Sequence, residues 1–119
     1  MLEALKRGDY DYGLAQFADD VVWHLPGRGP LAGDHEGRGA VLTAMRRFEK
    51  LSGGTLHIDL HDVLANDEHV LVLLRATGER GDRRYDLLET DVYHVRDGLI
   101  REFWSFSEDQ RLTDEFWSG

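Results

Sequence analysis

The sequence predicts an α+β domain in which helices cover one face of an antiparallel β-sheet. Apolar residues recur with helical spacing in much of the first half, and they alternate with polar residues, as in strands, in the second half. Three dipeptides typical of two-residue hairpin loops separate the strand candidates: Asn66-Asp67, Gly81-Asp82 and Asp97-Gly98. A chain of 119 residues can build one hydrophobic core, so residues 1–119 are expected to form a single domain.

Three helices are expected before residue 54. Leu2 and Leu5 predict a short helix that ends near Gly8, and Asp9 is a suitable N-cap for a second helix that carries Phe17. The third is "AVLTAMRRFEKL", which ends at Gly53-Gly54 and has apolar residues at Val41, Leu42, Met45 and Phe48. A short strand, "DDVVWHLPG", and a glycine-rich loop, "GRGPLAGDHEGRG", lie between the second and third helices. No Gly-Lys-Ser/Thr follows this loop, so it is not a phosphate-binding loop.

Four strand candidates form the second half. They are "TLHIDLHDVLA", "HVLVLLRATGER", "RRYDLLETDVYHVR" and "LIREFWSFSED", and they predict an antiparallel meander. These strands are long, so the sheet should curve strongly. The remaining segment, "RLTDEFWSG", is expected to be a tail that buries Phe116 and Trp117.

Composition excludes several classes of function. The net charge of −9 argues against nucleic acid and anionic membranes as partners, because both favour clustered Lys and Arg. The absence of Cys excludes disulfides and thiolate catalysis. No apolar run approaches the ~20 residues of a membrane span, and the N-terminus lacks the apolar core of a signal peptide. We therefore expect a cytoplasmic protein.

The hairpin loops fix which residues lie opposite one another. Counting from the three loops gives two rows on one sheet face: His61–Val72–Asp91–Trp104 and Asp59–Leu74–Glu89–Phe106. Because this face also carries Tyr85, Leu87 and Tyr93, it is the expected core face, beneath the third helix.

Carboxylates on a core face must be paired or protonated, because an unpaired buried carboxylate is strongly disfavoured. One interpretation is a hydrogen-bonded polar cluster in which His61 pairs with an acid. The other is a ligand site, since an aromatic cavity with a few convergent polar groups is typical of one. His61 and Asp91 would be two strands apart, roughly 9–10 Å at the backbone, so a ligand could bridge them.

Two further groups of residues could bear on the site. His57, Asp59 and His61 alternate along one strand, but Cβ atoms ~7 Å apart are poorly placed for a shared metal, and no metal or cofactor is expected. Trp23 and His24 are adjacent, and strand alternation directs only one of them inward; Trp23 is the expected pocket wall.

The order of these segments resembles the nuclear-transport-factor-2-like superfamily, in particular its SnoaL-like branch, which includes polyketide cyclases. The resemblance is carried by "GDYDYGLAQFADDVVWHLPG", "PLAGDHEGRGAVL", "HDVLAND" and "DVYHVRDGLIREFW", which cover nearly the whole chain. It implies a curved sheet wrapped by three N-terminal helices into a cone with an internal pocket (a cystatin-like α+β barrel). It also implies a homodimer through the outer sheet face, for which Leu71, Leu73, Leu88, Val92 and Phe103 are suitable.

The resemblance places Asp91 where SnoaL-like cyclases have an acid/base aspartate. Other positions depart from related enzymes. The oxyanion tyrosine of ketosteroid isomerases would fall near Met1, and their base aspartate near His24 or Leu25. The Arg-x-Asp of limonene-epoxide hydrolases is absent from "HVLVLL". Neither of these two activities is therefore expected.

The expected function is binding of a small, mostly apolar, carbonyl-bearing molecule. Any reaction would be cofactor-free acid/base chemistry such as isomerisation, cyclisation or hydration. Asp91 would transfer the proton, and His61 or Glu89 would assist it. The expected ligand-binding residues are Trp23, His24, Asp59, Tyr93, Trp104 and Phe106. The alternative is a ligand-binding or dimerising module without chemistry.

Overall fold

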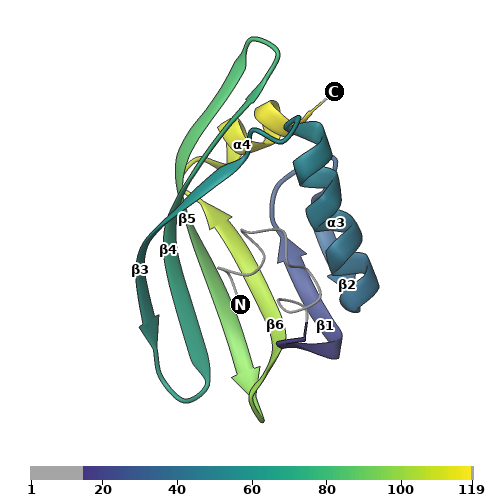
Figure 1. Cartoon of the computed structure of the whole chain (residues 1–119), viewed down its shortest axis with the longest axis vertical. Helices are drawn as coiled ribbons and strands as arrows, with labels where there is room; N and C mark the ends of the chain where they lie inside the picture. The colour runs from purple at the N-terminus through teal and green to yellow at the C-terminus, as the bar shows by residue number, and fades with distance from the viewer. Residues whose placement is uncertain (1–14, 119) are drawn as a thin grey trace.

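The computed structural model describes residues 15–118, which form one curved six-stranded sheet and two helices (Figure 1). The strands are β1 (Phe17–Leu25), β2 (Gly33–Glu36), β3 (His57–Ala65), β4 (His69–Arg80), β5 (Arg83–Arg96) and β6 (Leu99–Ser107), and the helices are α3 (Arg38–Leu51) and α4 (Gln110–Trp117). The spatial order of the strands is β2-β1-β6-β5-β4-β3. All neighbouring strands are antiparallel except β1 and β6, which run parallel. The sheet is therefore mixed.

Four predictions are confirmed: the α+β class, the strand before the third helix, that helix, and the four-stranded meander. Two of the three expected hairpin loops occur as predicted, with Arg80 opposite Arg83 and Arg96 opposite Leu99. Asp97 and Gly98 both adopt positive φ, 54° and 76°, as a type I′ turn requires. No helix among the described residues is long and apolar enough to span a membrane.

Three segments differ from the expectation. The two helices expected first fall largely on residues 1–14, outside the described part, and Phe17, expected in the second, begins β1. The glycine-rich loop contains the short strand β2, which pairs with β1. The C-terminal segment is a helix, α4, whose N-cap Asp109 accepts a hydrogen bond from the Leu112 amide.

The register between β5 and β6 differs from the predicted one by one residue. Val95 faces Ile100 but His94 faces Glu102, so Arg101 is an extra residue, a β-bulge, in β6. Asp91 therefore lies opposite Ser105, and the prediction that it lies opposite Trp104 is wrong. Because side chains alternate between faces, the bulge turns Phe103 inward and Trp104 outward. Phe103, expected on the outer face, is only 2% exposed.

The register between β3 and β4 also differs. The side chain of Asn66 accepts hydrogen bonds from the amides of Glu68 and His69, and the turn moves so that Ala65 faces Val70 rather than Glu68. A second bulge, between Leu60 and Asp62, leaves His61 without a cross-strand partner. As a result, the side chains of residues 57–60 lie on the opposite sheet faces from those predicted.

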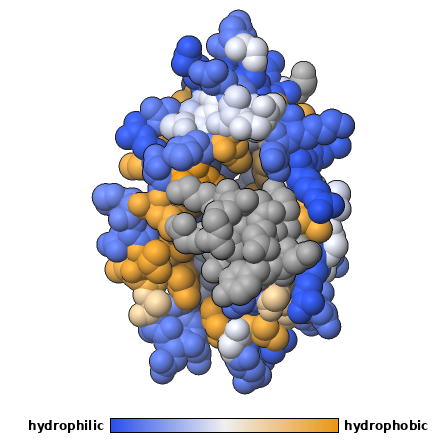
Figure 2. All heavy atoms as spheres, viewed as in Figure 1, coloured by the Kyte–Doolittle hydropathy of each residue, from blue (hydrophilic) through white to orange (hydrophobic). Residues whose placement is uncertain are grey.

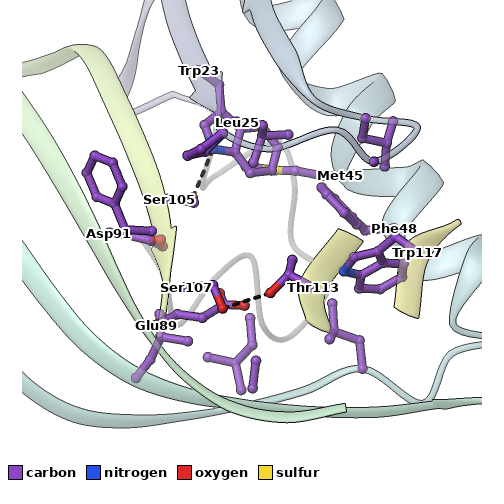
Figure 3. Close-up of a pocket in the computed structure, with 18 of the residues that line it drawn as sticks. Trp23, Leu25, Met45, Phe48, Glu89, Asp91, Ser105, Ser107, Thr113 and Trp117 are labelled. Carbon is purple, nitrogen blue, oxygen red and sulfur yellow. Dashed lines mark hydrogen bonds between the residues drawn. The ribbon is translucent and has the colours of Figure 1, made fainter. Parts of the chain in front are cut away.

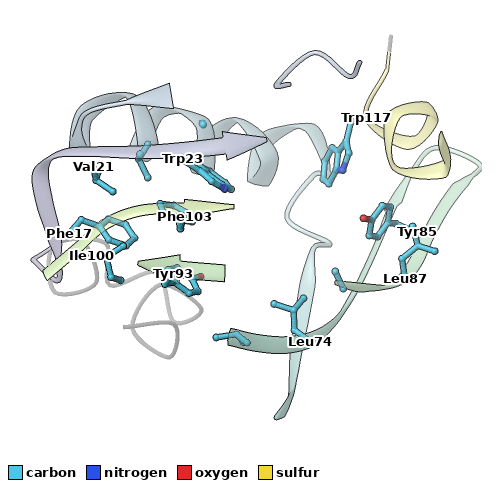
Figure 4. Packing of buried hydrophobic residues seen from close by; sticks show 14 of the residues in the cluster. Phe17, Val21, Trp23, Leu74, Tyr85, Leu87, Tyr93, Ile100, Phe103 and Trp117 are labelled. Atoms are coloured by element: carbon cyan, nitrogen blue, oxygen red, sulfur yellow. The ribbon is translucent and has the colours of Figure 1, made fainter. Parts of the chain in front are cut away.

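The core is one cluster of aliphatic and aromatic residues, within which two groups of aromatic rings can be distinguished (Figure 4). In the first, the ring of Phe103 stacks on Phe17, Trp23 and Tyr93, with ring centroids 5.1–5.3 Å apart. In the second, Tyr85 packs on Phe116 and Trp117 of α4. Phe116 and Trp117 are 3% and 6% exposed, so their predicted burial is confirmed. Viewed as in Figure 1, hydrophobic surface gathers around the middle of the molecule and hydrophilic surface at its two ends (Figure 2).

Candidate functional site

A cavity of about 470 Å³ is lined by the inner face of the sheet, by α3 and α4, and by the loop of residues 26–32. Most of its wall is apolar or aromatic, as Figure 3 shows for Trp23, Leu25, Met45, Phe48 and Trp117. Pockets that bind small molecules commonly measure about 300–1,000 Å³ and combine an apolar wall with a few polar groups. This cavity has that size and character.

Strand β5 provides the polar groups at the centre of the cavity. Glu89, Asp91 and Tyr93 alternate with outward-facing residues, so all three side chains lie on the inner face. Opposite them on β6 lie Ser107, Ser105 and Phe103, respectively. The predicted positions of Asp91, Glu89 and Tyr93 on the pocket face are confirmed, although their cross-strand neighbours are not the predicted ones.

Asp91 is a carboxyl group with little solvation. Its Oδ2 accepts a hydrogen bond of 3.1 Å from the Tyr93 hydroxyl, and its buried Oδ1 has no hydrogen-bond partner within residues 15–118. Burial raises the pKa of Asp91 to about 6, against the lowering effect of the Ser105 and Tyr93 hydroxyls. Asp91 thus changes protonation state within about a unit of neutral pH.

Ser105 is positioned by Trp23. The indole Nε1 of Trp23 donates a hydrogen bond of 3.0 Å to Ser105 Oγ. Since that bond uses the oxygen of Ser105 as an acceptor, its single hydroxyl proton remains for another acceptor, and Asp91 lies directly across the strand pair. Because β6 lies between β1 and β5 in the sheet, Ser105 lies between the Trp23 indole and the Asp91 carboxyl group.

Glu89 is hydrogen-bonded to the first of three hydroxyl groups that contact one another in series. The Tyr85 hydroxyl donates to Glu89 Oε1 and also contacts Thr113 Oγ1 of α4 at 3.0 Å. Thr113 in turn donates to Ser107 Oγ at 2.7 Å (Figure 3). Burial raises the pKa of Glu89 to about 7, the hydrogen bond from Tyr85 opposes this, and the charge of Asp91 adds to it. Two carboxyl groups that titrate near neutrality thus share one apolar cavity.

Trp23 lines the cavity as predicted and is 7% exposed. Trp104 does not line it, because the bulge at Arg101 places Trp104 on the outer face. Phe106 borders the cavity, but its side chain is 45% exposed.

His24 lies on the outer side of the sheet rather than in the cavity. Its Nδ1 is 2.7 Å from Asp34 Oδ1, its Nε2 is 2.6 Å from Glu102 Oε2, and its ring stacks on Trp104. Burial lowers the pKa of His24, but the hydrogen bonds and charges of Glu102 and Asp34 together outweigh it and raise the pKa. Two carboxylate partners favour the imidazolium, in which both ring nitrogens carry protons.

The expected positions of His61 and Asp59 are also corrected. The bulge in β3 leaves both side chains exposed, with Asp59 opposite Arg75. Asp59 contacts His57 at 2.9 Å rather than Asp91 or Glu89. Within residues 15–118, no three His, Asp or Glu side chains come together as a metal-binding group.

Sequence reasoning missed Ser105, Ser107 and Thr113. The alternation of Ser105 and Ser107 with aromatic residues in "WSFS" was a signal that these serines share a face, but the one-residue error in register assigned them to the wrong one. Thr113 was missed because its helix was not predicted.

Comparison with known proteins agrees with this fold. Residues 1–103 match the model of the SnoaL-like domain. A curated relative, the uncharacterized protein Rv0034 of Mycobacterium tuberculosis, is 31% identical over 116 residues, which are 97% of this chain and 88% of the relative. The chain belongs to the SnoaL-like domain family, and the resemblance expected from the sequence is confirmed.

Two solved structures are similar over nearly the whole chain. Bal32a, from a soil-derived mobile gene cassette, has 34% sequence identity and a TM-score of 0.92, covering 97% of this chain and 88% of its own. A Xanthomonas campestris protein with a cystatin-like fold has 29% identity and a TM-score of 0.91, covering 98% of this chain and 92% of its own.

Proposed function

We propose that this protein binds a small, mostly apolar, carbonyl-bearing molecule in the cavity and that Asp91 transfers a proton during acid/base chemistry on it. The observation that carries the proposal is Asp91 itself, a carboxyl group in an apolar cavity with a pKa raised to about 6. A general base is most effective when its pKa lies near the working pH. At pH 7 most Asp91 is ionised and ready to accept a proton.

The surrounding groups suit this role. The Tyr93 hydroxyl holds one oxygen of Asp91, and the Trp23–Ser105 hydrogen bond orients the hydroxyl that faces it. Asp91 would remove a proton from the carbon next to the carbonyl group and return it at another position. Isomerisation and aldol-type cyclisation both begin with that step, and the same carboxyl group could deliver the proton in a hydration. Glu89 is the second carboxyl group of the site, in place of the exposed His61.

The test begins with the natural ligand. Native mass spectrometry of the purified protein would look for a co-purified small molecule, whose conversion is then followed with wild type and Asp91→Asn between pH 5 and 8. We expect the wild-type rate to rise with pH through about 6, because Asp91 must be ionised to act as a base, and we expect no conversion by the variant.

The second candidate is a binding module without chemistry. It is favoured by the apolar character of most of the cavity wall, because an apolar wall can bind a ligand without any catalytic group. A molecule that binds in the cavity and is recovered unchanged at every pH from wild type would support this candidate and contradict the role of Asp91 in proton transfer.

A further inference from the structure

The ionisable groups around the cavity are mostly acids. Its described wall contains four carboxylic acids, Glu49, Glu89, Asp91 and Asp114, and one imidazole, His57, and among residues 15–118 no Lys or Arg side chain lines it. Asp114 already accepts hydrogen bonds from Gln110 and from the Arg28 amide. An anionic ligand would therefore meet four acids and, among the described residues, no Lys or Arg; the one imidazole, His57, already contacts Asp59.

Glu89 has one oxygen left for a ligand. Its Oε1 accepts from Tyr85, whereas no described residue donates a hydrogen bond to Oε2. The hydroxyls nearby are already engaged, since Tyr85 contacts Thr113, and Thr113 contacts Ser107. Glu89 lines the cavity, so a hydrogen-bond donor on a ligand bound there can reach Oε2.

The remaining wall favours a cation on an apolar body. Trp23, Phe48 and Trp117 present aromatic rings to the cavity. Aromatic faces attract ammonium groups, and the attraction grows when water is excluded. Charge-assisted hydrogen bonds between N–H and carboxylate are also stronger than neutral ones.

We propose that the ligand carries a protonated primary or secondary amine on an apolar, aromatic-sized body, and that the ammonium N–H donates to Glu89 Oε2. This inference rests on the proposed function and specifies its ligand class. Glu89 binds the amine, which leaves Asp91 for the reacting carbon, and the aromatic wall holds the body of the ligand. The cavity discriminates against carboxylate-bearing compounds of the same shape.

The test uses three probes of similar size with one apolar body: 2-(naphthalen-1-yl)ethylamine, 2-(naphthalen-1-yl)ethanol and 3-(naphthalen-1-yl)propanoate. Their dissociation constants for wild type are measured by isothermal titration calorimetry at pH 8, where Glu89 is mostly ionised. We expect the amine to bind about tenfold more tightly than the alcohol, and the carboxylate more weakly than either. The N,N,N-trimethyl form of the amine keeps the charge and its attraction to the aromatic rings but has no N–H, so it should lose only the part of the advantage that the hydrogen bond to Glu89 provides.

Two variants localise the effect. Glu89→Gln should bring the amine and the alcohol to within about twofold of each other, whereas Glu115→Gln removes the same charge from the exposed side of α4 and should keep the tenfold preference. Circular dichroism would confirm that both variants are folded, and the wild-type series is decisive without them.

Equal affinity for the amine and the alcohol, tighter binding of the carboxylate, or no binding of any probe would overturn the inference. Equal binding of all three would still agree with an apolar ligand site as proposed above. The proposed function itself fails separately, if the co-purified molecule is not converted or if Asp91→Asn converts it as fast as wild type.

Discussion

Asp91 is ionised at neutral pH at the expense of folding stability. Its folded-state pKa of about 6 exceeds the ordinary value of 3.8, so the folded state binds the proton more tightly than the unfolded chain does. Stability therefore falls as pH rises from about 4 to about 6, and the deficit persists at higher pH. A shift of this size corresponds to roughly 3 kcal/mol.

We predict that Asp91→Asn is as stable as wild type or more stable at pH 7.5, because asparagine is neutral at every pH. The lost Tyr93 hydrogen bond would offset about 1 kcal/mol of the gain. Urea unfolding at pH 7.5 and pH 4.5 measures this, and the variant's advantage should shrink at the lower pH. A steep loss of stability at pH 7.5 would mean that ionised Asp91 supports the fold, and it would no longer be a candidate base.

The contribution of His24 also falls as pH rises, but over a higher pH range. Its pKa is raised in the folded state, so the stabilisation from Asp34 and Glu102 is fully present below pH 6.5 and is lost as pH rises through the folded-state pKa. We predict that His24→Gln lowers the urea midpoint most at pH 5.5 and progressively less toward pH 8.5. His57→Gln is the control, since His57 is 61% exposed and has one exposed carboxylate partner. A difference between wild type and His24→Gln that does not change with pH would contradict an imidazolium at this position.

At the scale of elements, the loop after β1 depends on Gly27. Gly27 has a φ of +96°, and a Cβ at this position would lie 2.3 Å from Asp114 and from Gln110 of α4. Gln110 donates to the Pro26 carbonyl and Asp114 accepts from the Arg28 amide, so the close approach joins this loop to α4 beside the cavity. Only glycine permits this backbone conformation together with this contact.

We predict that Gly27→Ala lowers the free energy of unfolding by about 2 kcal/mol, because it strains the backbone and displaces the Gln110 and Asp114 side chains from their hydrogen bonds to this loop. Gly33→Ala is the matched control, because Gly33 has a φ of +114° but no heavy atom within 4 Å of its added Cβ. It should show the strain alone, about 1 kcal/mol. Equal losses for the two variants in urea unfolding would mean that the contact with α4 adds nothing.

The elements of the meander could be predicted from the sequence because hairpin turns leave local signals such as Asp97-Gly98. Their register could be predicted only as far as the first bulge. Neither Arg101 nor His61 has a residue type that marks an extra position, since each bulge depends on how neighbouring strands pack. Asp91 and Glu89 lie on β5, which pairs with β4 without a bulge, so they could be placed in the site from the sequence. Ser105 lies beyond the bulge in β6, so it could not. The strand β2 is too short to show a period.

At the scale of the whole molecule, the outer sheet face carries several apolar side chains that are partly exposed. Leu71, Leu73, Val92 and Trp104 are partly exposed there, and Leu88 is 52% exposed. A strand facing water would alternate with polar residues, and residues 70–74 of β4 do not. Large apolar patches commonly mark association surfaces.

We predict that this face forms a homodimer. Sedimentation equilibrium at micromolar concentration should give twice the mass of the 13.6 kDa chain, and Leu88→Arg should shift the equilibrium toward the monomer. Arg84→Ala, which changes another exposed position of β5, should remain dimeric. A wild-type sample containing only the 13.6 kDa species would exclude the dimer.

The parallel pairing of β1 with β6 affects how the chain folds during synthesis. Trp23 pairs with Phe103, about 80 residues later in the sequence, whereas β3 to β6 pair through short hairpins. Such distant pairing closes a long loop and is slow to form. On the ribosome, β1 emerges before the other described strands but has no parallel partner until β6 has been made. The hydrogen bond from Trp23 to Ser105 can form only then, so the cavity is assembled after the hairpins that supply its carboxyl groups.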